Sequence, residues 1–173
     1  AASHLSAAGH LGLDVWTAPA VAHVTVPPSR RARRRPGVRL HWRDLDPDDV
    51  RGDVTRPLRT VLDCAGSEPF PEALAIADSA LRSGMVEREQ LLAAGDGPRS
   101  PRGGCLAGAR AADPRAASAF ESVLRGTLIR AGMRCFVPQY PVALPRFTAH
   151  VDLGDPATRL AVEAEGFTYH AHH

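Results

Sequence analysis

The sequence predicts a mixed α/β fold, and three observations lead to this prediction. Short runs in which apolar and polar residues alternate, bounded by Pro or Gly, are typical of strands and occur in both halves of the chain. Apolar residues at helical spacing predict several helices, of which residues 116–131 are the clearest. The composition, 44% hydrophobic and 23% charged, is that of a folded globular chain, and 173 residues suit one domain or two small ones.

Residues 1–94 form the first predicted unit, a small α/β segment. Thr55 is the expected N-cap of one helix, and Pro57 fits the first turn of that helix because the missing N–H is not needed there. Asp63 and Asp78 are expected at the surface or as capping residues. In chain order, we expect a helix over 3–13, strands over 22–26, 38–42 and 50–54, and helices over 55–65, 71–83 and 87–94.

Residues 95–114 are the predicted linker and a short helix. The stretch GDGPRSPRGG at 95–104 is dense in Gly, Pro and Ser, which is typical of a connection between two units. The second unit is predicted over 115–173 and has the order helix, strand, strand, strand. Its expected elements are the helix over 116–131, an edge strand over 136–142 that contains two Pro residues, and strands over 147–153 and 159–165 joined by a turn at Gly154-Asp155-Pro156.

An arginine cluster, RRARRR at residues 30–35, lies in the connection between two predicted strands. All 21 basic residues of the chain are Arg, whose planar fork can bind a phosphate through two hydrogen bonds. Clustered Arg attracts polyanions by Coulomb attraction and counterion release, so Arg31, Arg33 and Arg34 are candidate nucleic-acid contacts. A solvated loop explains the cluster equally well, and a net charge of +2 permits nucleic-acid binding without requiring it.

The last predicted hairpin brings three carboxylates together. Glu163 and Glu165 are two residues apart, so they leave the same face of one strand, and Asp152 approaches them across the turn. Such a cluster repels itself unless a cation or protons neutralise it. Mg²⁺ prefers hard oxygen ligands with room for water, which makes Asp152 and Glu163 the expected metal ligands. Acids that are simply exposed on a hairpin surface are the alternative interpretation.

These carboxylates carry a resemblance to a known superfamily. An Asp at the end of one strand, followed by Glu-x-Glu in the next, resembles the PD-(D/E)XK nucleases, which have a restriction-endonuclease-like fold. The stretch GFTYHAHH at 166–173 is similar to the Gly-aromatic-His stretch of Vsr-like (very-short-patch-repair) endonuclease domains of actinobacterial proteins. The resemblance covers roughly residues 115–173 and implies an αβββ core that is truncated before the following αβ.

The resemblance also implies a set of catalytic residues. A Glu on the preceding helix often completes the site in the superfamily, and Glu121 in the sequence SAFE matches it. Glu165 stands where the motif has Lys, and this chain has no Lys. A His near the position of His170 serves in place of that Lys in Vsr-like enzymes. The implied activity is hydrolysis of nucleic-acid phosphodiester bonds with Mg²⁺ or Mn²⁺, on DNA as the expected substrate, although RNA stays open.

The first unit carries a second resemblance, which supports an alternative function. The stretches SHLSAAGHLGL, HVTVP, VTRPLRTVLDCA and ALAIADSALRSG look like the body of proteins related to the abortive-infection type IV antitoxin (AbiEi). A Vsr-like domain often follows this region in actinobacterial proteins. The alternative to an enzyme is therefore a non-catalytic DNA-binding regulator whose nuclease fold is degenerate.

The remaining features concern location and extent. The chain has neither an apolar run long enough to span a membrane nor a signal peptide, so we expect a cytoplasmic protein without a membrane partner. Three scattered Cys predict no disulfide framework. The first residue is Ala and the resembled family continues past residue 173, so we expect a fragment at both ends. The oligomeric state is not predicted.

Overall fold

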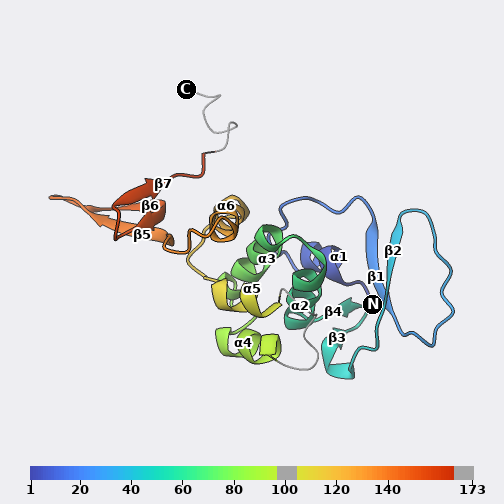
Figure 1. Cartoon of the computed structure of the whole chain (residues 1–173). Coiled ribbons are helices and arrows are strands. Elements are labelled where there is room, and N and C mark those ends of the chain that lie inside the picture. Colours follow the sequence, from blue (N-terminus) through green and yellow to red (C-terminus); the bar gives the residue numbers. More distant parts are fainter. Residues whose placement is uncertain (97–104, 166–173) are drawn as a thin grey trace.

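The protein is described here by a computed structural model that covers residues 1–96 and 105–165 (Figure 1). Within these ranges it combines six α-helices and one short 3₁₀ helix with strands in three small sheets, which confirms a mixed α/β fold. Most of the predicted linker stretch and His170 lie outside the described residues. The helices are α1 His4–His10, the 3₁₀ helix η1 Pro47–Asp49, α2 Pro57–Ser67, α3 Phe70–Arg82, α4 Arg88–Asp96, α5 Cys105–Ala111 and α6 Ala119–Arg130. The strands are β1 Ala22–Val26, β2 Val38–Trp42, β3 Val50–Arg51, β4 Val54–Thr55, β5 Val137–Ala143, β6 Thr148–Asp155 and β7 Leu160–Val162.

The helices form the middle of an elongated molecule, with strands at both ends (Figure 1). The β1–β2 pair and its long connection lie at one end, and the β5–β6–β7 sheet projects from the other end beyond α6. None of the helices in the described ranges combines the length and apolar character that a membrane-spanning helix needs. The hydrophobic core lies between the helices, and it is built from Ala8, Leu13, Val61, Cys64, Leu74, Ile76, Ala77, Ala80, Val86, Leu91, Ala109 and Ala112.

Helix α2 begins at Pro57, as its fixed φ favours, but the predicted cap is wrong. Arg56 is the N-cap residue and makes no side-chain capping bond. Thr55 belongs to β4 instead, and its hydroxyl lies 2.7 Å from the Thr60 hydroxyl inside the fold. Burial of both threonines explains the difference, because the Thr55 hydroxyl is used for a tertiary contact.

The strands of the first unit match the sequence predictions closely, with one difference. β1 and β2 have the predicted bounds, and they pair in parallel from Ala22 opposite Val38. Residues 27–37, which include the arginine cluster, form the connection between them. The strand expected over 50–54 is divided instead into β3 and β4, which pair antiparallel around a turn at Gly52-Asp53.

Helix α6 packs closely on α3, and a glycine permits this approach. A Cβ atom added to Gly126 would lie 2.6 Å from Pro71 Cα, which is closer than real Cβ contacts. Next to Gly126 in the sequence, Arg125 Nη2 donates to both carboxylate oxygens of Asp78, at 2.9 and 2.8 Å. Both side chains are buried, with 4% and 0% exposure for Arg125 and Asp78. The ion pair therefore joins α6 to α3 where water cannot replace it.

The predicted surface position of two aspartates is corrected by this packing. Asp78 also accepts a hydrogen bond from Asp113 N at 2.7 Å, so one carboxylate holds three segments together. Asp63 is buried as well and forms an ion pair with Arg59, one helical turn earlier on α2. A charged side chain is seldom buried without such a partner, and here each aspartate has a buried arginine.

After α6, the described chain forms an antiparallel sheet of order β5–β6–β7. β5 lies at an edge, as its prolines predicted. The turn between β6 and β7 lies at residues 156–159, later than predicted, because Gly154 and Asp155 belong to β6. Gly154 serves close packing rather than a turn, since an added Cβ would lie 2.6 Å from Tyr140 Cβ.

Replacing Arg125 by Met should destabilise the protein strongly, because it leaves the Asp78 carboxylate buried without its charge partner. We expect the free energy of unfolding to fall by about 3–5 kcal/mol in urea denaturation. The matched control is Arg115→Met, which removes an ion pair of 2.6 Å to Asp113 whose arginine is 55% exposed. This control should lower stability by no more than about 1 kcal/mol, and equal losses in the two variants would contradict the structural role of the buried pair.

Candidate carboxylate site

Glu121 is fixed at the start of α6 by hydrogen bonds with the two residues before the helix. Ser118 is the N-cap, and its Oγ accepts a hydrogen bond from Glu121 N at 3.2 Å. The same hydroxyl lies 3.2 Å from Glu121 Oε1, and Ala117 N donates to Glu121 Oε2 at 2.9 Å. The helix N-terminus favours a carboxylate at this place, and the side chain is only 7% exposed. Glu121 is therefore held in one orientation, in which its Oε2 also accepts a hydrogen bond from β5.

Gln139 on β5 joins this glutamate to Asp152. Its Nε2 donates to Glu121 Oε2 at 2.9 Å and lies 3.4 Å from Asp152 Oδ1. Its φ is 49°, in the left-handed region that residues with a Cβ rarely adopt. Gln139 lies opposite Asp152 in the register of β5 and β6, but the ladder pairing passes over both residues. Strain of this kind concentrates at functional sites, because the surrounding structure must maintain it.

Asp152 and Glu163 lie side by side, as the sequence predicted for a hairpin. The register places Leu153 opposite Val162, so the next pair outward is Asp152 and Glu163. Ala164 N donates to Asp152 Oδ2 at 2.8 Å, and Asp152 N lies 3.5 Å from Glu163 Oε2. Asp152 Oδ1 has the long contact to Gln139. Three elements, α6, β5 and β6, and the chain that follows β7 thus converge on one small region.

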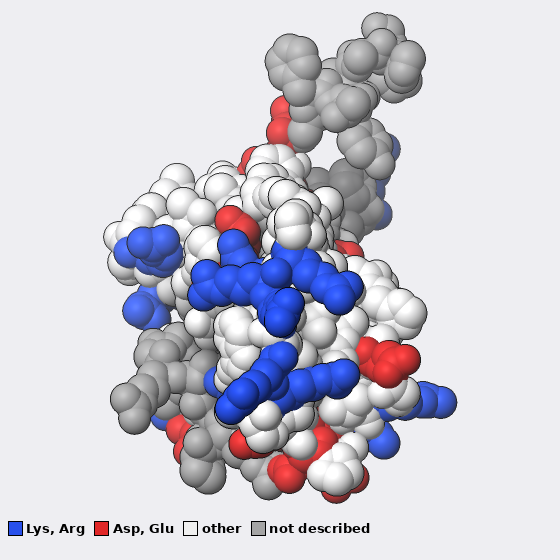
Figure 2. Space-filling view, turned by 90° about the vertical axis from the view of Figure 1, so that its right-hand side faces the viewer, with Lys and Arg blue, Asp and Glu red and all other residues white. Residues whose placement is uncertain are grey.

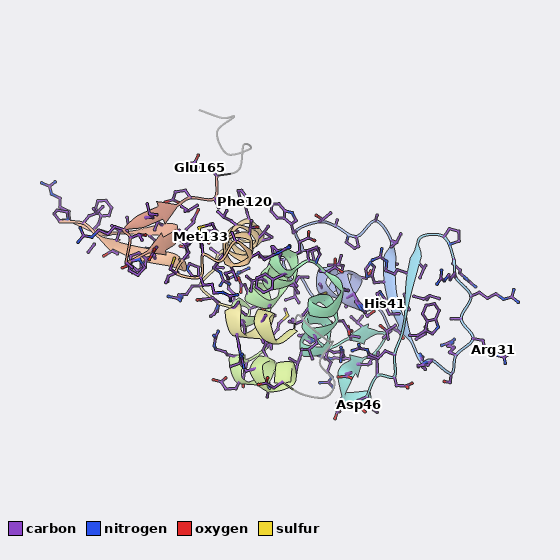
Figure 3. All side chains as sticks on the ribbon, in the orientation of Figure 1. Arg31, His41, Asp46, Phe120, Met133 and Glu165 are labelled. Carbon is purple, nitrogen blue, oxygen red and sulfur yellow. The ribbon has the colours of Figure 1, made fainter. Side chains whose placement is uncertain are left out.

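Glu165 lies outside the sheet, because β7 ends at Val162 (Figure 3). The strand alternation that predicted a shared face for Glu163 and Glu165 therefore stops before either residue. Glu165 is exposed, but its charge acts on the site. Partial loss of hydration, together with the charges of Asp152 and Glu165, raises the pKa of the Glu163 carboxyl above its ordinary value. Carboxylates that raise one another's pKa in this way repel each other, and a bound cation would relieve that repulsion.

The donor set suits a hard divalent cation. Asp152 and Glu163 offer carboxylate oxygens at an open edge of the sheet, where water can complete the coordination that Mg²⁺ requires. Glu121 reaches this pair through Gln139. The residues that could hold an ion are therefore Asp152 and Glu163, with Glu121 and Gln139 fixing the orientation of Asp152.

Gln139 is the site residue that the sequence predictions missed. Nothing in the composition of β5 marks it, since a glutamine between two apolar neighbours is common. Counting back from Asp152 through the β5–β6 hairpin would have placed Gln139 opposite that acid. Cross-strand register was therefore the usable signal, and it requires the turn to be located first.

The arginine cluster lies far from the carboxylates. Arg31, Arg33 and Arg34 are exposed in the β1–β2 connection, at the end of the molecule opposite the β5–β6–β7 sheet (Figure 3). The view onto that end shows arginine side chains gathered over its surface, with few acidic side chains between them (Figure 2). This surface and the carboxylate site can share a nucleic acid only if it extends along the molecule.

Comparisons with known proteins found no similarity that bears on this site. No protein-family model matches the chain, and neither a curated protein nor a solved structure shows significant similarity to it.

Neutralising Glu163 should stabilise the metal-free protein, because it relieves repulsion with Asp152 and Glu165. Glu163→Gln keeps an oxygen acceptor for Asp152 N, and at pH 7 we expect a rise in the unfolding midpoint of up to about 4 °C. Since the folded-state pKa of Glu163 lies above the ordinary value of 4.5, the gain should shrink as the pH falls through that raised pKa and should disappear below pH 4.5, where Glu163 is protonated in both states. Glu87→Gln, at an exposed position before α4, is the matched control and should change little. A lowered midpoint for Glu163→Gln would contradict the repulsion.

Proposed function

We propose that this protein is a metal-dependent endonuclease that hydrolyses phosphodiester bonds of nucleic acid, with DNA as its expected substrate. The single observation that carries the proposal is the convergence of Glu121, Gln139, Asp152 and Glu163 from separate elements. Acids scattered on a surface have no reason to share a buried capping glutamate and a strained glutamine. A catalytic site does, because its groups must be held in place before the substrate arrives.

The order of the elements supports a restriction-endonuclease-like core. Helix α6 is followed by the antiparallel strands β5, β6 and β7, which is the αβββ order implied by the resemblance to PD-(D/E)XK nucleases. One acid comes from the helix, one from β6, and one from the residue after β7. In this proposal Asp152 and Glu163 are the ligands of the metal ion. The segment from α6 to β7 is a truncated form of the restriction-endonuclease-like core.

In the proposed mechanism, a bound Mg²⁺ or Mn²⁺ would stabilise charge on the phosphate and lower the pKa of its water. Asp152 and Glu163 hold that cation at the open edge of the sheet. Glu121, acting through Gln139, would fix the orientation of the Asp152 carboxylate. Glu165 stands at the motif Lys position and is assigned to accept a proton from the attacking water. His170, which lies outside the described residues, is the second candidate for that proton transfer.

The proposal places the protein in the cytoplasm. Cys64 and Cys135, the cysteines whose side chains the structure describes, are free thiols. Free thiols agree with a reducing compartment, where disulfides are rare.

A DNA-binding regulator is the second candidate function. It is favoured by the separation of the exposed arginine surface from the carboxylate site, and by Glu165 at the place of the motif Lys. A regulator would bind through Arg31, Arg33 and Arg34 without using the carboxylates. The two functions differ in one respect that can be measured, namely whether a divalent cation and Asp152 are needed.

Asp152→Asn and Glu163→Gln should each abolish metal stabilisation and cleavage. A ligand present at 100 times its dissociation constant adds about 2.7 kcal/mol to the free energy of unfolding, and this gain should disappear in both variants. Nicking of supercoiled DNA and cleavage of labelled RNA, with Mg²⁺, with Mn²⁺ and with chelator, should fall to background. Glu87→Gln should behave as wild type. A wild-type protein that neither gains stability from these ions nor cuts either nucleic acid would contradict the enzyme and leave the regulator.

Replacing Arg31, Arg33 and Arg34 by Ala should weaken nucleic-acid binding and flatten its salt dependence. If all three contact phosphates, the slope of log K against log salt should decrease by up to about 3 units, measured by fluorescence anisotropy with a labelled duplex. The control replaces the exposed Arg51, Arg110 and Arg130 by Ala, which lowers the formal net charge from +2 to −1 by the same three charges. If the salt slope is unchanged, or if the control variant changes it equally, the arginine cluster is a solvated loop and not a nucleic-acid contact.

A further inference from the structure

Three histidines from separate elements meet at the opposite end of the molecule from the carboxylate site. His4 begins α1, His23 lies on β1 and His41 lies on β2, on the helix side of the strand pair (Figure 3). One ring nitrogen of each histidine lies within 4.8 Å of one ring nitrogen of each of the other two. Among the described residues, these three form the one group of His, Cys, Asp or Glu side chains whose ligand atoms all lie this close together. The parallel register explains the meeting, since His41 lies opposite Thr25, two residues from His23.

The distances within the cluster are close to those of ligands on one metal ion. His41 Nε2 and His23 Nδ1 are 3.4 Å apart. Two nitrogens bound to a tetrahedral Zn²⁺ at 2.0–2.1 Å are separated by about 3.4 Å. The rings of His4 and His41 are stacked, with centroids 3.5 Å apart and planes at 16°. Because imidazole nitrogens bind a metal in the plane of the ring, the stacked His4 and His41 rings must turn relative to each other when an ion binds.

Neighbouring groups prepare His4 for this role. Its Nδ1 lies 2.9 Å from Ser3 Oγ, which accepts a hydrogen bond from Thr25 Oγ1 at 2.7 Å. In the tautomer whose Nδ1–H donates to Ser3, the lone pair is on Nε2 and available to a metal. His4 also has a φ of 51°, so backbone strain is present at the residue that brings its ring into the cluster.

Burial lowers the pKa values of all three imidazoles. Burial, followed by the charges of His41, His23, Arg59 and Arg43, lowers the pKa of His4 to about 3. Burial and neighbouring charges likewise lower the pKa of His41 to about 4. Burial, and then the charge of Arg39, lower the pKa of His23.

An open cavity adjoins the cluster and contains an unsatisfied acid. Its volume is about 370 Å³, and His4, His41, Arg43 and Asp63 are among the residues that line it. Asp63 is 4% exposed and shares Oδ1 with Arg59, while its Oδ2 is buried without a hydrogen-bond partner. Buried carboxylate oxygens are nearly always paired, so an unpaired one in the wall of this cavity is unusual.

We propose that His4, His23 and His41 bind a transition-metal ion, Zn²⁺ above all, with its open fourth position toward the cavity. Three nitrogen ligands and one open position are typical of exchangeable zinc sites, whereas Mg²⁺ prefers oxygen. Asp63 compensates part of the charge of the ion from the cavity wall. The site is independent of the carboxylate cluster and of the proposed nuclease activity.

The surrounding charges limit how tightly the ion is held. Arg43 Nη1 lies 3.6 Å from Asp63 Oδ1, so Arg43 and Arg59 share one carboxylate and leave the region positive. Repulsion from this excess charge weakens binding relative to a closed cysteine-rich zinc site. The ion is thus expected to exchange with solution, and removal by chelator should be reversible.

The test uses Co²⁺ and Zn²⁺ on the full chain. Titration with Co²⁺ should produce visible d–d absorption that saturates at one ion per chain and is displaced by Zn²⁺ but not by Mg²⁺. His23→Gln and His41→Gln should weaken binding at least about tenfold. His10→Gln and His150→Gln, both at exposed positions, should bind as wild type. Asp152→Asn should also bind as wild type, which separates this site from the proposed nuclease site.

Two outcomes would overturn the proposal. One is saturation that is unchanged in His23→Gln and His41→Gln. The other is loss of binding when His170, His172 and His173 are replaced by Gln, which would place the metal on those residues. A measurement on the wild type covers the case in which a variant does not fold: Zn²⁺ should protect His41 from diethyl pyrocarbonate, mapped by mass spectrometry, while His10 still reacts. Equal reaction of His41 with and without Zn²⁺ would also contradict the site.

Discussion

The buried ion pair between Arg125 and Asp78 is the interaction on which the arrangement of this protein depends. It joins α6 to α3 at a point where Gly126 lets the helices approach closely. The same helix carries Glu121 at its N-terminus, so the position of α6 determines where that carboxylate faces the sheet. Gln139 then connects Glu121 to Asp152. A contact in the helical core is thereby linked to the geometry of the carboxylate site.

The two candidate sites rest on different physical chemistry. The carboxylate site concentrates negative charge at an exposed sheet edge, where a hard cation relieves repulsion and retains water. The histidine cluster concentrates neutral nitrogen donors beside α1, in surroundings made positive by Arg43 and Arg59. Such donors favour a softer ion. The two proposed metal sites thus differ in the class of ion that they suit, and they lie toward opposite ends of the molecule (Figure 1).

Local pattern predicted most of the secondary structure, because strand alternation and apolar helix stripes depend on near neighbours. β1 and β2 have their predicted bounds, and Asp152 meets Glu163 as the hairpin required. The failures involve partners distant in sequence. Burial of Asp78 follows from an arginine 47 residues away, and the histidine cluster follows from a parallel pairing that no local pattern specifies. Gly154 was predicted to turn the chain but serves packing against Tyr140, which only the fold brings near.

The central claim is that Asp152 and Glu163 bind a divalent cation, and diffraction from crystals soaked in Mn²⁺ tests it most directly. The anomalous signal of Mn²⁺ locates the ion without reference to any activity. The account predicts a peak within coordination distance, about 2.0–2.3 Å, of carboxylate oxygens of both residues, with Gln139 still joining Glu121 to Asp152. The absence of an anomalous peak at Asp152 and Glu163 in crystals soaked with Mn²⁺, or peaks only at other surface acids, would contradict this claim.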